Sequence, residues 1–187
     1  MTREEYLNAA TALMSPWFNA QGYPLPPVRV SVGIPAGNKG GKLKAIGQCW
    51  SPAASADETT EVFICPSQSD ATAVLAILVH ELVHAAVGLE HGHKGAFKRL
   101  ALALGLEGKM TSTTAGADLT ARLTAIISQL GAYPHAALNT ALSGRKKQST
   151  RMIKLECDDC GWTCRTAQKN VDAGLPTCHC GGSINVA

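Results

Sequence analysis

The sequence has few aromatic residues, no strong excess of charge of either sign and no long hydrophobic run. Phenylalanine, tryptophan and tyrosine make up 5% of its 187 residues, so a core has to be built mainly from aliphatic side chains. Hydrophobic residues make up 45% and charged residues 17%, which is the ordinary range for globular proteins and excludes a wholly disordered chain. The net charge of +3 neither requires nor excludes a nucleic-acid partner.

Segments that would place the chain in a membrane or send it for export are also lacking. The longest uncharged apolar run covers residues 71–79, whereas crossing a bilayer needs roughly 20 residues. Residues 1–5 contain two glutamates, and no apolar block follows them, as a secretory signal would require. We therefore expect a cytoplasmic protein without a membrane partner.

Seven cysteines in an intracellular chain favour metal binding over disulfides. Cys49 and Cys65 stand alone among apolar neighbours, and we expect both to be buried small hydrophobic residues. The other five crowd the last 31 positions: Cys157, Cys160, Cys164, Cys178 and Cys180.

Hydrophobic periodicity and turn residues predict an α+β domain followed by a smaller second domain. Helices are predicted over residues 4–20, 71–88, 94–104 and 117–130, and strands over residues 28–32, 43–50 and 61–65. Asp70 is a good N-cap for the second helix. The polar and basic stretch 143–150 is expected to be a linker between domains at 1–142 and 151–187.

The segment His80-Glu81-Leu82-Val83-His84 has the spacing of a metal site on a helix. Positions four apart share one face, about 6 Å from each other, so the two imidazoles can hold one zinc ion. Glu81 can reach a metal-bound water without ligating the metal, which is the position of a general base. The alternative is a core helix that carries these residues by chance, but a buried Glu81 would then need a partner.

A third ligand cannot lie on a straight continuation of this helix, because His91 would then be about 10 Å along the axis from His84. The chain has to break and return, and Gly88 and Gly92 offer places to do so. The residues alone leave both His91 and His93 as candidates.

This motif and the following segment Gly92-His93-Lys94-Gly95-Ala96-Phe97-Lys98 resemble the SprT-like metallopeptidase family, which includes the Spartan proteases. The resemblance covers residues 47–104, including the two strands ahead of the helix, and extends loosely to the cysteine-rich tail. In that family a histidine in a Gly-His-Gly-x-x-Phe-type segment is the third zinc ligand. His93, four residues before Phe97, matches it, whereas Lys94 replaces the glycine that usually follows.

The resemblance implies a zincin-like domain with a small antiparallel sheet, a catalytic zinc ion on His80, His84 and His93, and Glu81 as the base in peptide-bond hydrolysis. Proteins attached to DNA are candidate substrates. His91 would then be a hydrogen-bond donor beside the site or a solvated turn residue.

The tail contains two cysteine pairs, each followed by glycine: Cys157-Asp158-Asp159-Cys160-Gly161 and Cys178-His179-Cys180-Gly181-Gly182, with 17 residues between the pairs. This pattern predicts a zinc ribbon with a structural zinc ion, because so short a segment cannot fold on its small core alone. The second pair is Cys-x-Cys rather than the commoner Cys-x-x-Cys, so Cys164 or His179 remains an alternative fourth ligand. A redox dithiol is disfavoured because no βαβ pattern surrounds the pairs.

The tail is also the basic part of the chain. From Gly144 onward seven cations face four anions, an excess equal to that of the whole chain. The cations are Arg145, Lys146, Lys147, Arg151, Lys154, Arg165 and Lys169. Together with Trp162 as a stacking surface, these cations favour contact with DNA. The alternative is that the cations belong to a solvated linker and that Trp162 is an ordinary tryptophan of the ribbon. A non-enzymatic nucleic-acid adaptor with two structural zinc ions is accordingly the alternative function, and a hydrolase of small substrates is a third.

Overall fold

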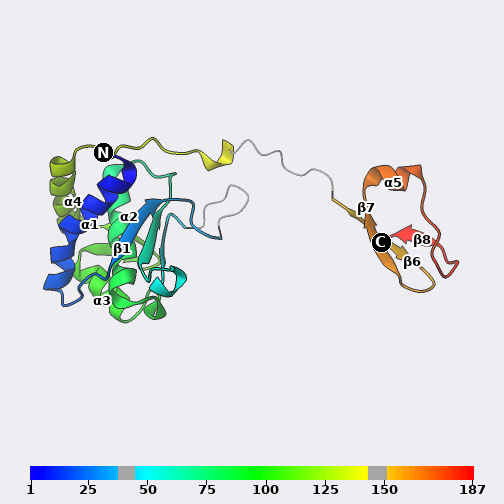
Figure 1. The fold of residues 1–187 in the computed structure, drawn as a ribbon, viewed down its shortest axis with the longest axis horizontal. Coiled ribbons are helices and arrows are strands. Elements are labelled where there is room, and N and C mark those ends of the chain that lie inside the picture. The colour runs from blue at the N-terminus through cyan, green and yellow to red at the C-terminus, as the bar shows by residue number, and fades with distance from the viewer. Residues whose placement is uncertain (38–44, 143–150) are drawn as a thin grey trace. The chain divides into compact units, whose positions relative to one another are not determined.

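The computed structural model describes residues 1–37, 45–142 and 151–187, which Figure 1 draws in colour. The chain divides into two units, Met1–Ser143 and Gly144–Ala187. The fold class is α+β: the first unit combines helices with small sheets, and the second contains three strands and a cysteine cluster. The predicted linker 143–150 lies outside the described residues.

The first helix, α1 (Arg3–Ala20), begins with a capping box, in which the side chains of Thr2 and Glu5 each accept a hydrogen bond from the other residue's backbone N–H. Its apolar face packs against β1 and α2. Burial of aliphatic and aromatic surface stabilises this packing. The buried residues of this face are Tyr6, Leu7, Ala10, Met14 and Phe18.

The main sheet has three strands, β1 (Val28–Val32), β2 (Gly47–Trp50) and β3 (Thr60–Ile64), in the order β1-β3-β2. β2 runs antiparallel to β3, but β1 runs parallel to it. The expectation of an antiparallel sheet is therefore wrong for this pair, and the sheet is mixed. The predicted strand 43–50 is shorter than expected, since β2 starts at Gly47, and residues 43–44 lie outside the described part.

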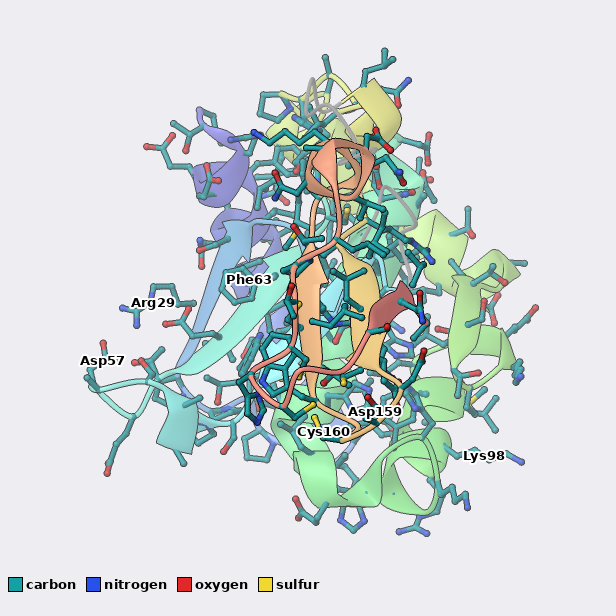
Figure 2. All side chains as sticks on the ribbon, turned by 90° about the vertical axis from the view of Figure 1, so that its right-hand side faces the viewer. Arg29, Asp57, Phe63, Lys98, Asp159 and Cys160 are labelled. Atoms are coloured by element: carbon teal, nitrogen blue, oxygen red, sulfur yellow. The ribbon has the colours of Figure 1, made fainter. Side chains whose placement is uncertain are left out.

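Strand periodicity predicts which residues of a strand are buried, but not the direction in which its neighbours run. The alternate residues Thr60, Val62 and Ile64 of β3 are all buried, so β3 takes the central position and β1 and β2 become its neighbours on either side. Arg29 of β1 lies directly opposite Glu61 of β3 and donates to it at 2.6 Å. Figure 2 shows Arg29 extending toward Asp57, to which it also donates, at 3.1 Å. The pair with Glu61 matches the parallel register, but ion pairs this accessible to solvent stabilise it little.

Helix α2 (Ala71–Val87) is the central element of the first unit. Asp70 caps it as predicted, because its Oδ1 accepts a 2.8 Å hydrogen bond from the Ala73 N–H. The helix contacts α1, α3 (Ala96–Ala103) and α4 (Ala117–Leu130), and also β2 and β3. Nine of its residues are buried, which explains why its sequence is hydrophobic nearly all round.

A hairpin that the sequence pattern did not reveal, β4 (Leu106–Lys109) and β5 (Ser112–Ala115), connects α3 to α4 and contacts α2 through β5. Short 3₁₀ helices cover Pro52–Ala54, Leu89–His91 and Thr140–Leu142. α4 packs its buried residues Leu119, Leu123 and Ile126 into the core, so its described contacts are those of a packing helix.

The second unit is an antiparallel sheet of β6 (Ile153–Cys157), β7 (Thr163–Thr166) and β8 (Ile184–Val186), in the order β7-β6-β8, with the short helix α5 (Gln168–Ala173). Its buried core consists of Leu155, Cys157, Cys178 and Ile184. Two of these four residues are cysteines, and so small an apolar core needs a further source of stability.

Across residues 1–37, 45–142 and 151–187, the helices are all too short or too polar to traverse a lipid bilayer.

Candidate metal centres

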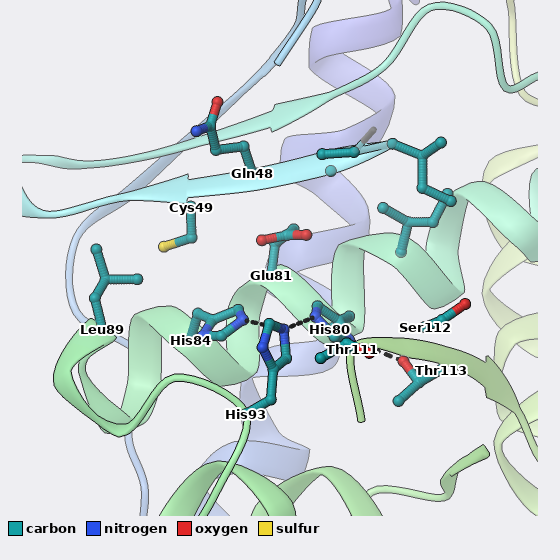
Figure 3. Close-up of a pocket in the computed structure, with 14 residues that line it drawn as sticks. Gln48, Cys49, His80, Glu81, His84, Leu89, His93, Thr111, Ser112 and Thr113 are labelled. Carbon is teal, nitrogen blue, oxygen red and sulfur yellow. Dashed lines mark hydrogen bonds between the residues drawn. The ribbon is translucent and has the colours of Figure 1, made fainter. Parts of the chain in front are cut away.

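The first candidate centre lies on α2, where His80 and His84 are one helical turn apart and their ring centroids are 5.2 Å from each other (Figure 3). Phe97 of α3 packs against both rings, with centroid distances of 5.0 Å to His80 and 4.3 Å to His84. The Phe97 side chain is fully buried. It therefore forms a rigid apolar support that limits the rotamers of the two imidazoles.

His93 reaches the same point because the chain reverses at glycines on both sides of it. Gly88 ends α2 with φ of 92°, and Gly92 and Gly95 have φ of 49° and 52°. These left-handed conformations are strained for other residues, so the glycines permit the tight return. His93 Nε2 lies 3.2 Å from His80 Nε2 and 3.2 Å from His84 Nε2.

Of the two histidines that the sequence left open, the structure brings His93 into the centre and leaves His91 outside it. His91 ends the 3₁₀ helix Leu89–His91, its side chain is 41% exposed, and it lies 3.9 Å from the carboxylate of Glu90. The 3₁₀ helix Leu89–His91 and the positive φ of Gly92 separate the two histidines, and of the two His93 joins the converging group.

The donor set fits a small divalent cation. Tetrahedral bonds of about 2.0–2.1 Å, as in zinc sites, place two ligand nitrogens about 3.3 Å apart, close to the 3.2 Å observed. Burial, followed by the charge of His93, lowers the pKa of His80 to about 4. Burial, followed by the charges of His80 and His93, lowers the pKa of His84 to about 3. Burial also lowers the pKa of His93. The imidazoles are therefore neutral near pH 7, and their lone pairs are available for a metal.

Glu81 lies beside this group and extends toward strand β2 (Figure 3). The residue is only 7% exposed, and its burial raises the pKa of the carboxyl to about 8, although a hydrogen bond from the Cys49 backbone lowers it. A Cβ atom on Gly47 would lie 2.4 Å from Glu81 Oε1. The carboxylate thus occupies space that only a glycine in β2 leaves free.

A pocket of about 560 Å³ opens over the histidines and Glu81. It is lined by β2 and the residues before it, by α2, and by the hairpin residues Thr111–Thr113; Ile77 and Leu89 add apolar surface. Cys65 is buried as predicted, but Cys49 is only partly buried and lines this pocket. Because Cys49 lies on β2 opposite Glu81, burial, followed by the charge of Glu81, raises the pKa of its thiol to about 12.

The hairpin contributes a residue that sequence reasoning missed. Thr113 of β5 has its hydroxyl 2.8 Å from Nδ1 of His80. The run Thr111-Ser112-Thr113-Thr114 is rich in β-branched residues, which favour strands, so a strand could have been predicted there. No spacing rule, however, connects position 113 to position 80.

The second candidate centre is in the second unit, where the Sγ atoms of Cys157, Cys160, Cys178 and Cys180 lie within 4.8 Å of one another. The Sγ atoms of Cys157 and Cys180 are 3.6 Å apart, and those of Cys160 and Cys178 are 3.5 Å apart. Tetrahedral bonds of about 2.3 Å to thiolates require separations of about 3.8 Å, so this donor set also fits a metal ion.

The turns of this centre have the predicted glycines. Gly161 and Gly181 have φ of 69° and 86°, and their N–H groups donate to Cys157 and Cys178, respectively, closing a tight turn after each pair. Hydrogen bonds from the backbone of Cys160 and Asp159 help lower the pKa of the Cys157 thiol to about 7, which favours the thiolate.

The two alternative ligands lie outside the group of four. Cys164 is in β7, opposite Leu155 of β6. His179 places its Nδ1 3.6 Å from Cys178 Sγ, but it is not part of the converging set. All seven cysteines are free thiols in the structure.

No protein-family model, no curated protein and no solved structure matches the chain.

Proposed function

We propose that this chain is a zinc metallopeptidase with a zincin-like catalytic domain, similar to the SprT-like proteases, and a structural zinc ribbon at residues 151–187. One observation carries the proposal: His80, His84 and His93 converge beside a buried Glu81 at the base of an open pocket. A purely structural metal site is closed by a fourth protein ligand, whereas catalytic sites keep one position open. Among the described residues, three side chains make up this group.

His80, His84 and His93 would hold a zinc ion, which would act as a Lewis acid that lowers the pKa of water toward 7 and polarises a carbonyl group. Glu81 takes the part of general base: its carboxylate accepts a proton from the attacking water and passes it to the leaving amine. Glu81 has to be ionised for the first step, and a cation beside it favours the ionised form. The high proton affinity that burial gives the carboxyl suits the first step, in which it accepts the proton, and the more basic leaving amine takes the proton in the second step.

The pocket also suits an extended peptide. β2 pairs with β3 on one side, and no strand pairs with its other side in the part of the chain that the structure describes. A peptide can therefore add to this edge through main-chain hydrogen bonds, which brings its backbone over Glu81 and the histidines. Ile77 and Leu89 offer apolar surface to its side chains.

The test compares Glu81→Gln with Glu90→Gln. Glu90 is the control because its carboxylate is exposed and lies in the 3₁₀ helix that follows α2. Metal content per chain and cleavage of a disordered protein, such as casein, are measured with and without single-stranded DNA. Because Glu81 moves the proton and does not ligate, E81Q keeps the metal content of the wild type and loses about 10²–10⁴-fold in cleavage rate. E90Q cleaves as the wild type does.

His93→Ala and His91→Ala complete the experiment, because H93A loses one of two metal ions and H91A loses none. Wild-type cleavage by metal-loaded E81Q contradicts the role of Glu81. Loss of metal in H91A, but not in H93A, contradicts the ligand set.

A nucleic-acid adaptor is the second candidate function, and the second unit favours a DNA partner in either case. Arg165 of β7 lies directly opposite Lys154 of β6. Glu156 of the same strand forms an ion pair with Lys154, so the argument for a DNA partner depends on the excess of cations in this part of the chain. Trp162, just before β7, is 43% exposed and available for stacking on a base. Salt-sensitive DNA binding by the wild type, with no cleavage of any protein after prolonged incubation, supports the adaptor over the peptidase.

A further inference from the structure

Thr113 contacts the candidate metal centre without belonging to its donor set. Its hydroxyl lies 2.8 Å from Nδ1 of His80, while Nε2 of the same ring lies 3.2 Å from His93 Nε2 (Figure 3). The two nitrogens of His80 therefore have separate partners: Nε2 faces the other histidines, and Nδ1 faces strand β5.

The second imidazole of α2 has no such contact. Nδ1 of His84 is buried and has no hydrogen-bond partner among the described residues. His84 is held by packing against Phe97, with ring centroids 4.3 Å apart. His80 packs less closely on Phe97, at 5.0 Å, so its orientation depends more on the hydrogen bond from its ring.

We propose that Thr113 is a positioning residue that fixes the tautomer and the ring orientation of His80 for metal binding. The Nδ1–H of His80 donates to Thr113 Oγ1, which leaves Nε2 unprotonated and directed at the point that the three histidines share. Threonine suits this role because its β-branched side chain has few rotamers in a strand, and pairing of β5 with β4 holds its backbone. The inference rests on the proposed metal centre, but not on peptidase activity.

The test uses Thr113→Val, which keeps the shape and removes the hydroxyl, and Thr113→Ser, which keeps the hydroxyl. Thr114→Val is the matched control, because Thr114 is the next residue of β5 and is exposed on its opposite side. Zinc affinity of the full chain is measured by competition with a chromophoric chelator. Cobalt(II) titration separates the two centres, since only the cysteine centre gives thiolate charge-transfer bands.

We expect T113V to weaken zinc binding at the histidine centre by about tenfold to 100-fold. T113S is expected to restore most of the affinity, T114V to equal the wild type, and the cysteine centre to be unchanged in all three. Nitrogen-15 NMR of the metal-free chain is expected to show His80 as the Nδ1–H tautomer in the wild type and a mixture of tautomers in T113V. A merely structural role for Thr113 would lower the thermal stability without changing the tautomer.

Zinc affinity of T113V within twofold of the wild type overturns the inference, as does an Nε2–H tautomer of His80 in the metal-free wild type. If the wild type binds no metal at the histidines, the proposed function and this inference both fail. If the wild type binds metal but cleaves nothing, only the peptidase proposal fails.

Discussion

Replacing Gly47 by alanine tests whether the position of Glu81 determines the activity that we propose. The new Cβ would lie 2.4 Å from Glu81 Oε1 and 2.7 Å from the Ile77 side chain, whereas ordinary contacts begin at 3.4 Å. The carboxylate therefore has to move by about 1 Å. Gly47 has no positive φ, so the substitution strains this packing and not the backbone. Overpacking of this kind costs about 1–3 kcal/mol of stability.

A shift of about 1 Å in a catalytic group can lower the rate by about 10²-fold. We expect that loss in the cleavage rate of G47A, measured on a disordered protein at a temperature well below its unfolding transition. Metal content is expected to stay at the wild-type value, because the atoms nearest to the new methyl group belong to Glu81 and Ile77 and not to a histidine. Gly33→Ala is the control: its Cβ would lie 3.1 Å from Phe63, away from the pocket, so G33A is expected to retain the wild-type rate.

Wild-type cleavage by fully metallated G47A would refute the reasoning, since it would mean that Glu81 can move by this distance without consequence. Loss of metal from G47A would also contradict it, because the histidine centre would then depend on the packing of β2 against α2.

Two further predictions concern pH and the cysteine centre. In the metal-free chain, the free energy of unfolding is expected to be greatest near pH 6.5. Below that pH the unfolded chain takes up protons that His80 and His84, whose folded pKa values are lowered to about 4 and about 3, do not. Above it, Glu81, whose folded pKa is raised to about 8, holds a proton that the unfolded chain has already lost. Chemical denaturation between pH 4 and 8 measures this profile, and a curve without a maximum contradicts it. In the second unit, Cys160→Ser is expected to lose the metal and the fold of β6–β8, whereas Cys164→Ser keeps both, as measured by metal content and circular dichroism; equal loss in both variants contradicts the four-cysteine set.

Local patterns in the sequence were sufficient for the elements that carry the candidate ligands. The cap at Asp70 and the glycine at position 88 predict the bounds of helix α2, and this helix places His80 and His84 on one face. The two cysteine pairs with their glycines likewise predict turns that direct thiols to one point. These features depend on residues a few positions apart, whose geometry the backbone conformation determines directly.

Other features were decided only by the tertiary structure. The parallel pairing of β1 with β3, the entry of His93 rather than His91, the contact of Thr113 with His80 and the space that Gly47 leaves for Glu81 all join segments distant in the sequence. Such contacts depend on the path of the chain between the segments, and many paths are compatible with the same periodicity. The path is selected by packing of the whole core, because close-packed side chains around α2 leave few arrangements without voids or clashes.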